Sequence, residues 1–126
     1  MNRTRTRTLA ALFSLALLAP AFADEAVQKS IADVYQEKAE LAGKPVKIQG
    51  KVVKVNNNIM NRNFLHLRDG SGDPAAGNND LTITSDGTAA MGDTVTVTGT
   101  LAVDLDFGSG YKYPLLLEKA TITQVP

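Results

Sequence analysis

The stretch from Lys44 to Gly72 constrains the fold more than any other part of this 126-residue chain. It reads KPVKIQGKVVKVNNNIMNRNFLHLRDGSG, and both of its halves alternate apolar and polar side chains. A period of two is typical of a β-strand with one buried face and one wet face. The stretch therefore predicts two strands, each ended by a turn, whose core-facing residues are Val46, Ile48, Val53, Val55, Leu65 and Leu67.

Gly50 stands where the pattern of the first strand would carry a side chain. We interpret it as a β-bulge or sharp bend that lets the strand curl, because the alternation slips directly afterwards, at Lys51–Val53. Residues 56–62 are expected to join the two strands, and the Asp-Gly-Ser-Gly sequence at 69–72 is expected to turn the chain after the second.

Three further alternating segments follow, at 80–84, 94–104 and 113–125, separated by a polar loop, by a connector with weak helical character around 88–91, and by a Gly-rich turn. Five short strands predict an all-β fold, the five-stranded Greek-key barrel called the OB-fold. The strand spacing also allows a small β-sandwich. Glycine kinks at Gly50 and Gly99 favour the barrel, because small barrels need corners.

One helix is predicted ahead of the strands, at Ala26–Ala42. Ser30 and Asp33 resemble a capping box, which would move the helix start inward to about Ile31, and Gly43 supplies a stop signal. We expect the apolar stripe of this helix to cover one end of the barrel. Docking of the helix to a partner protein is the alternative.

The first 23 residues have the three parts of a secretory signal peptide. Arg3, Arg5 and Arg7 precede an apolar run that is well short of the roughly 20 residues of a transmembrane helix, and Ala-Phe-Ala at 21–23 forms a cleavage site. We expect export to the periplasm, cleavage after Ala23 and no stable membrane anchor. The expected organisation is a signal peptide at 1–23, an N-terminal helix at 24–43 and an OB-fold domain at 44–126.

Composition narrows the functions that the mature chain can have. Without the leader, ten basic residues face thirteen acidic ones, and a net charge near −3 argues against non-specific binding to phosphate backbones. The chain has no cysteine, which excludes disulfides, thiolate catalysis and thiolate metal sites. Catalysis is poorly supported, because there is one histidine and no H-E-x-x-H or G-x-S-x-G motif.

Several motifs carry a resemblance to known families. VKIQGKVVKV followed by NFLHLRDGSG resembles the first hairpin of the anticodon-binding OB domains of class II tRNA synthetases. The segments Leu41–Lys44, Ile59–Gly72, Gly92–Gly99 and Asp106–Tyr111 are similar to a family of small exported bacterial OB-fold proteins. Asn61 stands where that family usually has glycine, and Phe64 where it usually has tryptophan. The resemblance implies an OB-fold, and it implies function only by analogy of fold.

OB-folds bind ligands on the face of their second and third strands, between two flanking loops. Applied to this chain, the rule predicts that three outward-facing residues of the second strand and several residues near the two loops form a binding surface. The candidate ligand-binding residues are Phe64, His66, Arg68, Arg62, Met60, Lys51, Phe107, Tyr111 and Lys112. Rings interleaved with cations suit flat ligands or single-stranded bases. The same rings would equally serve to cover the sheet or to hold a hairpin.

We therefore expect a monomeric, non-catalytic, exported OB-fold binding module without cofactor or resident metal, whose ligand is a periplasmic protein or a small molecule. Single-stranded nucleic acid on the same face is the first alternative. Cu(I) bound through Met60 and His66 is the second, since thioether and imidazole groups are copper ligands.

Overall fold

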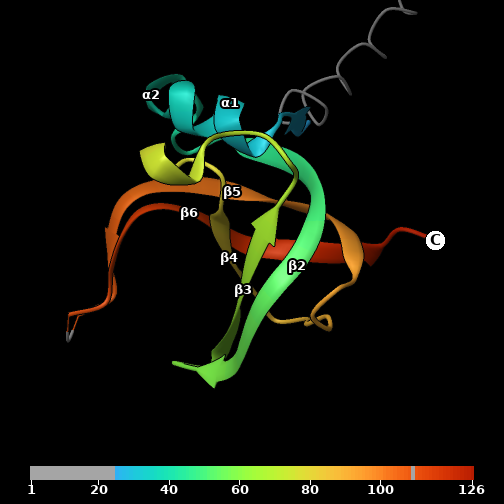
Figure 1. The fold of residues 1–126 in the computed structure, drawn as a ribbon. Coiled ribbons are helices and arrows are strands. Elements are labelled where there is room, and N and C mark those ends of the chain that lie inside the picture. Colours follow the sequence, from blue (N-terminus) through green and yellow to red (C-terminus); the bar gives the residue numbers. More distant parts are fainter. Residues whose placement is uncertain (1–24, 109) are drawn as a thin grey trace, which may run out of the picture.

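The computed structural model describes residues 25–108 and 110–126, which form one six-stranded mixed sheet and short helices. The strand order is β1-β2-β3-β4-β6-β5, and β2 also pairs with β5. This second pairing turns the sheet back on itself, so that five strands form a nearly closed ring with the helices at one end (Figure 1). The strands are β1 (Val27–Gln28), β2 (Pro45–Ile59), β3 (Arg62–Arg68), β4 (Leu81–Ser85), β5 (Thr94–Asp106) and β6 (Lys112–Gln124).

The predicted alternation of β2 and β3 is confirmed for the residues that fill the ring. Val46, Ile48, Leu65 and Leu67 are fully buried in one core with residues of β4, β5 and β6. The bulge, however, does not fall at Gly50. The pairing of β2 with β3 shifts between Val52 and Lys54, so Val53 is the extra residue and is only half-buried.

Gly50 is needed for the close packing of two strands and not for the bulge that was expected there. A Cβ atom at this position would lie 3.1 Å from the carbonyl oxygen of Arg68, so the glycine lets β2 and β3 approach closely. The turn between these strands is also tighter than expected. β2 continues to Ile59, and only Met60 and Asn61 turn the chain, with φ of 52° and 64°, as in the two-residue turns that join twisted hairpin strands.

The N-terminal segment is not one continuous helix. Val27 and Gln28 form β1, which pairs in parallel with Val46 and Lys47 of β2. Two short helices follow, α1 (Ile31–Gln36) and α2 (Lys38–Leu41), separated by Glu37. The start at Ile31 agrees with the predicted cap, because the Ser30 hydroxyl accepts a hydrogen bond from the Asp33 N–H at 3.1 Å. Among the described residues, no helix is both long and apolar enough to span a membrane.

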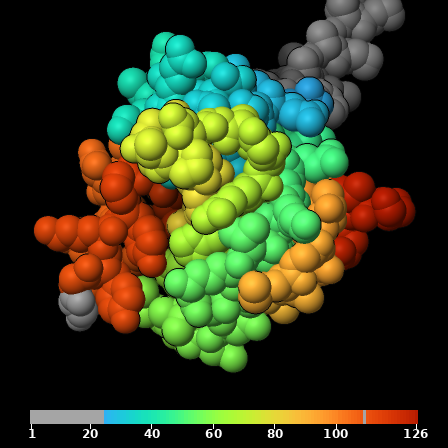
Figure 2. Space-filling view, viewed as in Figure 1, coloured from blue at the N-terminus to red at the C-terminus, as the bar shows by residue number. Residues whose placement is uncertain are grey.

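The turn after β3 holds the start of α1. Asp69 Oδ2 accepts from the Ile31 N–H at 2.9 Å, and the Ser71 hydroxyl accepts from the Ala32 N–H at 3.0 Å. Figure 2 shows the segment after β3, in yellow, lying against the helices, in cyan. Ile31, Val34 and Leu41 belong to the same buried core as the strands, so the helices cover one end of the ring, as expected.

The ring is weakest where β4 meets β6. These parallel strands share a single pair, Ile83 with Leu117, while β5 and β6 pair along nearly their whole length. A register shift between Thr98 and Thr100 confirms the kink predicted at Gly99, where a Cβ atom would lie 2.6 Å from the Glu118 carbonyl oxygen. The helical character expected around 88–91 is wrong, because the connector after β4 contains only turns and bends.

Candidate ligand-binding groove

Three aromatic rings form a cluster on the outer face of β3, against the hairpin that joins β5 to β6. The Phe64 ring stacks on Tyr113 with centroids 5.7 Å apart, and Phe107 contacts both rings edge-on at 5.9 Å. The Arg62 guanidinium lies 4.8 Å from the centroid of the Phe107 ring, on the same cluster. The cluster therefore fixes the β5–β6 hairpin to the second strand of the ring.

Phe64 does point to the outside of the ring, but it is not an exposed stacking platform. Its side chain is only 4% exposed, because Phe107 and Tyr113 cover it. The N-terminal helices contribute no ring to this cluster. Of the predicted aromatic residues, Tyr111 alone remains open, with 46% of its surface exposed.

His66 and Arg68 lie next along β3 and share one carboxylate. His66 Nδ1 lies 2.8 Å from Asp80 Oδ1, and Arg68 Nε donates to Asp80 Oδ2 at 3.0 Å. The Tyr35 hydroxyl of α1 donates to the Asp80 carbonyl oxygen at 2.5 Å. Burial, helped by the charge of Asp80, raises the pKa of Tyr35, so this phenol stays a neutral donor. Asp80 thus orients the imidazole and anchors the helix end to the sheet.

A small groove opens between this face and the tip of the β5–β6 hairpin. Its volume is about 190 Å³, and we refer to it as the Tyr111 groove; its lining residues are Asn56, Ile59, Phe64, His66, Tyr111 and Tyr113. Asn56 lies opposite Phe64 in the pairing of β2 with β3. The groove therefore combines apolar walls with an amide and the free edge of an imidazole.

The remaining predicted site residues do not converge on this groove. Lys51 and Arg68 line a separate hollow beside Gly50, and Lys112 lines another with Tyr113. Arg62 borders a larger cleft between β4 and β6. Met60, at the tip of the β2–β3 hairpin, is 38% exposed and lines none of these hollows.

Sequence reasoning missed Asn56, Ile59 and Asp80 as members or supports of the site. The sequence pattern predicts a loop at Asn56 and Ile59, whereas β2 extends through both of them. The sequence signal that could have extended the strand is the run of asparagines at 56–58, followed by Ile59. Asparagine tolerates the left-handed backbone that the bent end of a hairpin requires. Asp80 stood at the start of a predicted strand, and nothing in its local sequence indicated contact with residues 66 and 68.

No group of three or more histidine, cysteine, aspartate or glutamate side chains is placed to hold a metal ion in the described part of the chain. The two proposed copper ligands are also far apart along the hairpin. His66 lies four residue steps after Arg62 along β3, which corresponds to about 13 Å in a straight strand, and Met60 lies beyond Arg62.

No protein-family model matches this chain, and no curated protein matches it. Among solved structures, it is similar to a protein described as an aspartyl-tRNA synthetase from Leishmania major Friedlin, with a TM-score of 0.57 and 16% sequence identity. The match covers 89% of this chain and 26% of that one, so this chain spans about a quarter of that protein's length.

At such low identity, the similarity concerns the fold alone. It agrees with the expected likeness to an anticodon-binding, OB-like domain of a tRNA synthetase. Membership of the small exported bacterial family stays a prediction. The predicted signal peptide and its cleavage site lie outside the described residues.

Proposed function

We propose that this chain is an exported, monomeric, non-catalytic binding module built on a five-stranded Greek-key OB-fold. In this proposal a periplasmic protein or small molecule binds in the Tyr111 groove. The observation that carries it is the position of that groove, on the outer face of the ring's first hairpin and beside the β5–β6 turn, where OB-folds bind ligands. The arginines and apolar run of residues 1–23 support export.

The size and lining of the groove limit what it could hold. Pockets for drug-sized ligands have volumes of roughly 300–1,000 Å³, and this groove has about 190 Å³. It is therefore suited to one flat ring or one side chain of a larger partner. Tyr111 supplies an exposed ring at one side, while Asn56 and His66 supply polar groups that would orient the bound group.

A titration of the ¹⁵N-labelled protein with indole, followed by NMR, tests this proposal. We expect weak, saturable shifts of the amides of residues 56, 59, 66, 111 and 113, and their loss in Tyr111→Ala. Met91→Ala is the matched control, because Met91 is 68% exposed and does not line the groove. Shifts elsewhere, or shifts that persist in Tyr111→Ala, would rule out the groove as the site.

Single-stranded nucleic acid is the second candidate, and the likeness in fold to a tRNA synthetase favours it. The covered Phe64 ring and the acidic mature chain weigh against it. Fluorescence anisotropy with a twelve-residue oligothymidine at 50 and 200 mM salt distinguishes this candidate from the first proposal. We expect no measurable binding at either salt. Tight binding that weakens steeply with salt would replace the first proposal with this one.

Copper binding through Met60 and His66 is tested by Cu(I) titration of the parent and of His66→Ala. Because the two residues are well separated along the hairpin, we expect the same weak Cu(I) uptake for both proteins. A loss of tight uptake in His66→Ala would show that the imidazole is a copper ligand.

A further inference from the structure

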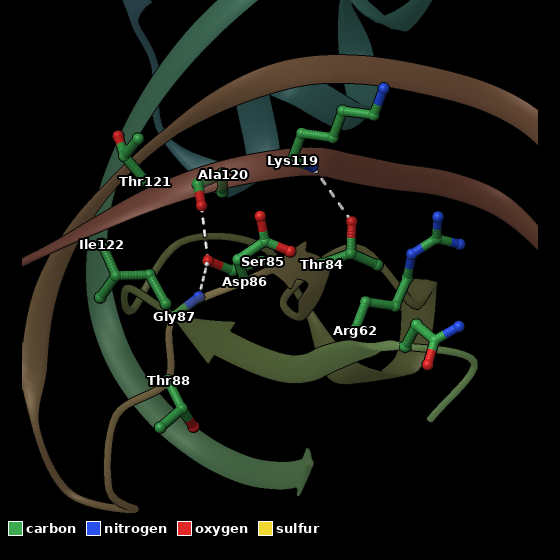
Figure 3. Close-up of a pocket in the computed structure, with 11 residues that line it drawn as sticks. Arg62, Thr84, Ser85, Asp86, Gly87, Thr88, Lys119, Ala120, Thr121 and Ile122 are labelled. Atoms are coloured by element: carbon green, nitrogen blue, oxygen red, sulfur yellow. Dashed lines mark hydrogen bonds between the residues drawn. The ribbon is translucent and has the colours of Figure 1, made fainter. Parts of the chain in front are cut away.

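A cleft opens in the described part of the chain where β4 and β6 separate. It has a volume of about 510 Å³ and lies between residues 84–88 and residues 119–122 (Figure 3). It shares no lining residue with the Tyr111 groove. The cleft exists because β4 and β6 pair only at Ile83 and Leu117, beyond which the two strands diverge.

One wall of this cleft is an unpaired strand edge. The Val125 N–H donates to the Thr94 carbonyl oxygen at 2.9 Å, and this places Thr121 and Thr123 among the residues of β6 that exchange hydrogen bonds with β5. In an antiparallel pair such residues alternate with ones whose N–H and C=O point the other way. Ile122 and Gln124 therefore direct their backbone groups away from β5, toward the side of the cleft, where no strand among the described residues pairs with them.

Side-chain hydroxyls fix the walls where the ladder between β4 and β6 stops. The Thr84 hydroxyl accepts from the Lys119 N–H at 3.1 Å, and the Ser85 hydroxyl donates to the Ala120 carbonyl oxygen at 2.6 Å, as Figure 3 shows. Lys119 has a φ of 52°, which bends β6 at this point. These bonds satisfy the Lys119 N–H and the Ala120 carbonyl group. The backbone N–H and C=O groups of Ile122 and Gln124 stay available to another chain.

The charges at the cleft favour an acidic occupant. Arg62 and Lys119 line it, and neither forms a salt bridge within the described part of the chain. Asp86 is the one acidic residue of the lining, and it too forms no salt bridge there. Two cations without salt-bridge partners in this part of the chain, against one carboxylate, give the cleft an excess of positive charge.

We infer that the β6 edge at residues 120–124 is a strand-addition site for an extended polypeptide segment that carries acidic side chains. Main-chain hydrogen bonds to Ile122 and Gln124 would hold the segment, and Arg62 and Lys119 would receive its carboxylates. This site is separate from the Tyr111 groove, and it is independent of the function proposed for that groove.

Hydrogen exchange and a peptide titration test the inference. In the free protein, the amides of Ile122 and Gln124 should exchange at least tenfold faster than those of Thr121 and Thr123. An acetylated and amidated seven-residue peptide of alternating valine and glutamate should slow the exchange of Ile122 and Gln124 and shift residues 84–88 and 119–124 by NMR. The matched peptide with lysine in place of glutamate should bind at least tenfold more weakly.

Two protein variants make the test specific to main-chain pairing. Gln124→Pro removes an N–H that the ring does not use, so we expect a folded protein in which the peptide no longer slows exchange at the β6 edge. It also removes the hydrogen bond from Gln124 Nε2 to Asp93 Oδ2, so Gln124→Ala, which loses only that side-chain bond, is the matched control and should still bind the peptide. Thr123→Pro removes an N–H that faces β5 and should destabilise the fold. Arg62→Gln combined with Lys119→Gln should weaken binding of the acidic peptide about tenfold.

Three results would overturn the inference. The first is equal and slow exchange of residues 121–124 in the free protein, which would mean that the edge is already paired. The second is equal binding of the lysine peptide. The third is binding of the acidic peptide that leaves residues 84–88 and 119–124 unperturbed, or that is unchanged in Gln124→Pro.

Discussion

Phe64 illustrates how the same residue can face outward and still be part of the packing. Its position on the outer face of β3 was predicted correctly from the alternation of Leu65 and Leu67, and its burial was not. The rings that cover it come from residues 107 and 113, more than forty positions further along the chain. A local pattern fixes the face of a strand, but it contains nothing about which distant segment lies on that face.

At the scale of the residue, we predict that Phe64→Ala lowers the free energy of unfolding by about 3 kcal/mol, because it removes a buried ring and leaves a cavity below Phe107 and Tyr113. Urea denaturation measures this change. Tyr111→Ala, at an exposed ring, should change stability by no more than about 0.5 kcal/mol. Equal stability of the two variants would mean that the aromatic cluster does not hold the hairpin.

At the scale of the element, the start of α1 depends on a turn that is remote in sequence. Burial alone would raise the pKa of Asp69, but the hydrogen bonds from the Ser71 hydroxyl, the Ile31 N–H and the Ser71 N–H outweigh it and lower the pKa. A carboxylate at a helix N-terminus is further favoured by the helix dipole. The Ser30 cap was visible in the sequence, whereas the second cap from residues 69–71 required the fold.

We predict that Asp69→Asn lowers the free energy of unfolding by about 1 kcal/mol at neutral pH. Since the folded-state pKa is below the ordinary value of 3.8, this stabilisation is present above that value and is lost as the pH falls through the folded pKa. Urea denaturation from pH 7 to pH 3 should therefore show the parent approaching the variant below about pH 4. Asp86→Asn, at an exposed carboxylate, should change the free energy of unfolding at neutral pH by no more than about 0.5 kcal/mol.

Gly99 permits a close approach of β5 and β6. We predict that Gly99→Ala destabilises the protein by about 2 kcal/mol or more, because the added Cβ would lie 2.6 Å from the Glu118 carbonyl oxygen. Thermal unfolding measures the change. Gly87→Ala is the control, since its Cβ would meet only the Ser85 hydroxyl at 3.6 Å. A tolerated Gly99→Ala would contradict the close contact of β5 and β6.

At the scale of the whole molecule, the strands of the ring could be predicted from the sequence, but the gap between β4 and β6, which we call the seam, could not. Alternation located β2 to β6 because each strand turns every second, apolar side chain into the core, although β4 is buried on both faces. The separation of β4 from β6 depends on Lys119 adopting a positive φ and on hydroxyls that replace ladder bonds, neither of which has a periodic signal. The Tyr111 groove was found only approximately for the same reason, because the hairpin that completes it is distant in sequence.

The seam itself is open to test. We predict that Ser85→Ala lowers the free energy of unfolding by about 2 kcal/mol, because the Ala120 carbonyl oxygen then loses its partner in a buried position. Faster hydrogen exchange of residues 117–121 should accompany the change. Thr88→Ala, whose hydroxyl bonds the exposed side chain of Asn57, should leave both quantities unchanged.

The hydrogen bond from the Ile31 N–H to Asp69 Oδ2 also determines the order in which segments of the chain fold. A six-residue helix is not stable by itself in water, and the acceptors for its first two N–H groups belong to residues 38 and 39 positions further along the chain. The N-terminal helices must therefore wait for the β2–β3 hairpin and its following turn before they become ordered. A chain interrupted before residue 71 would keep its N-terminal helices unfolded and accessible to proteases.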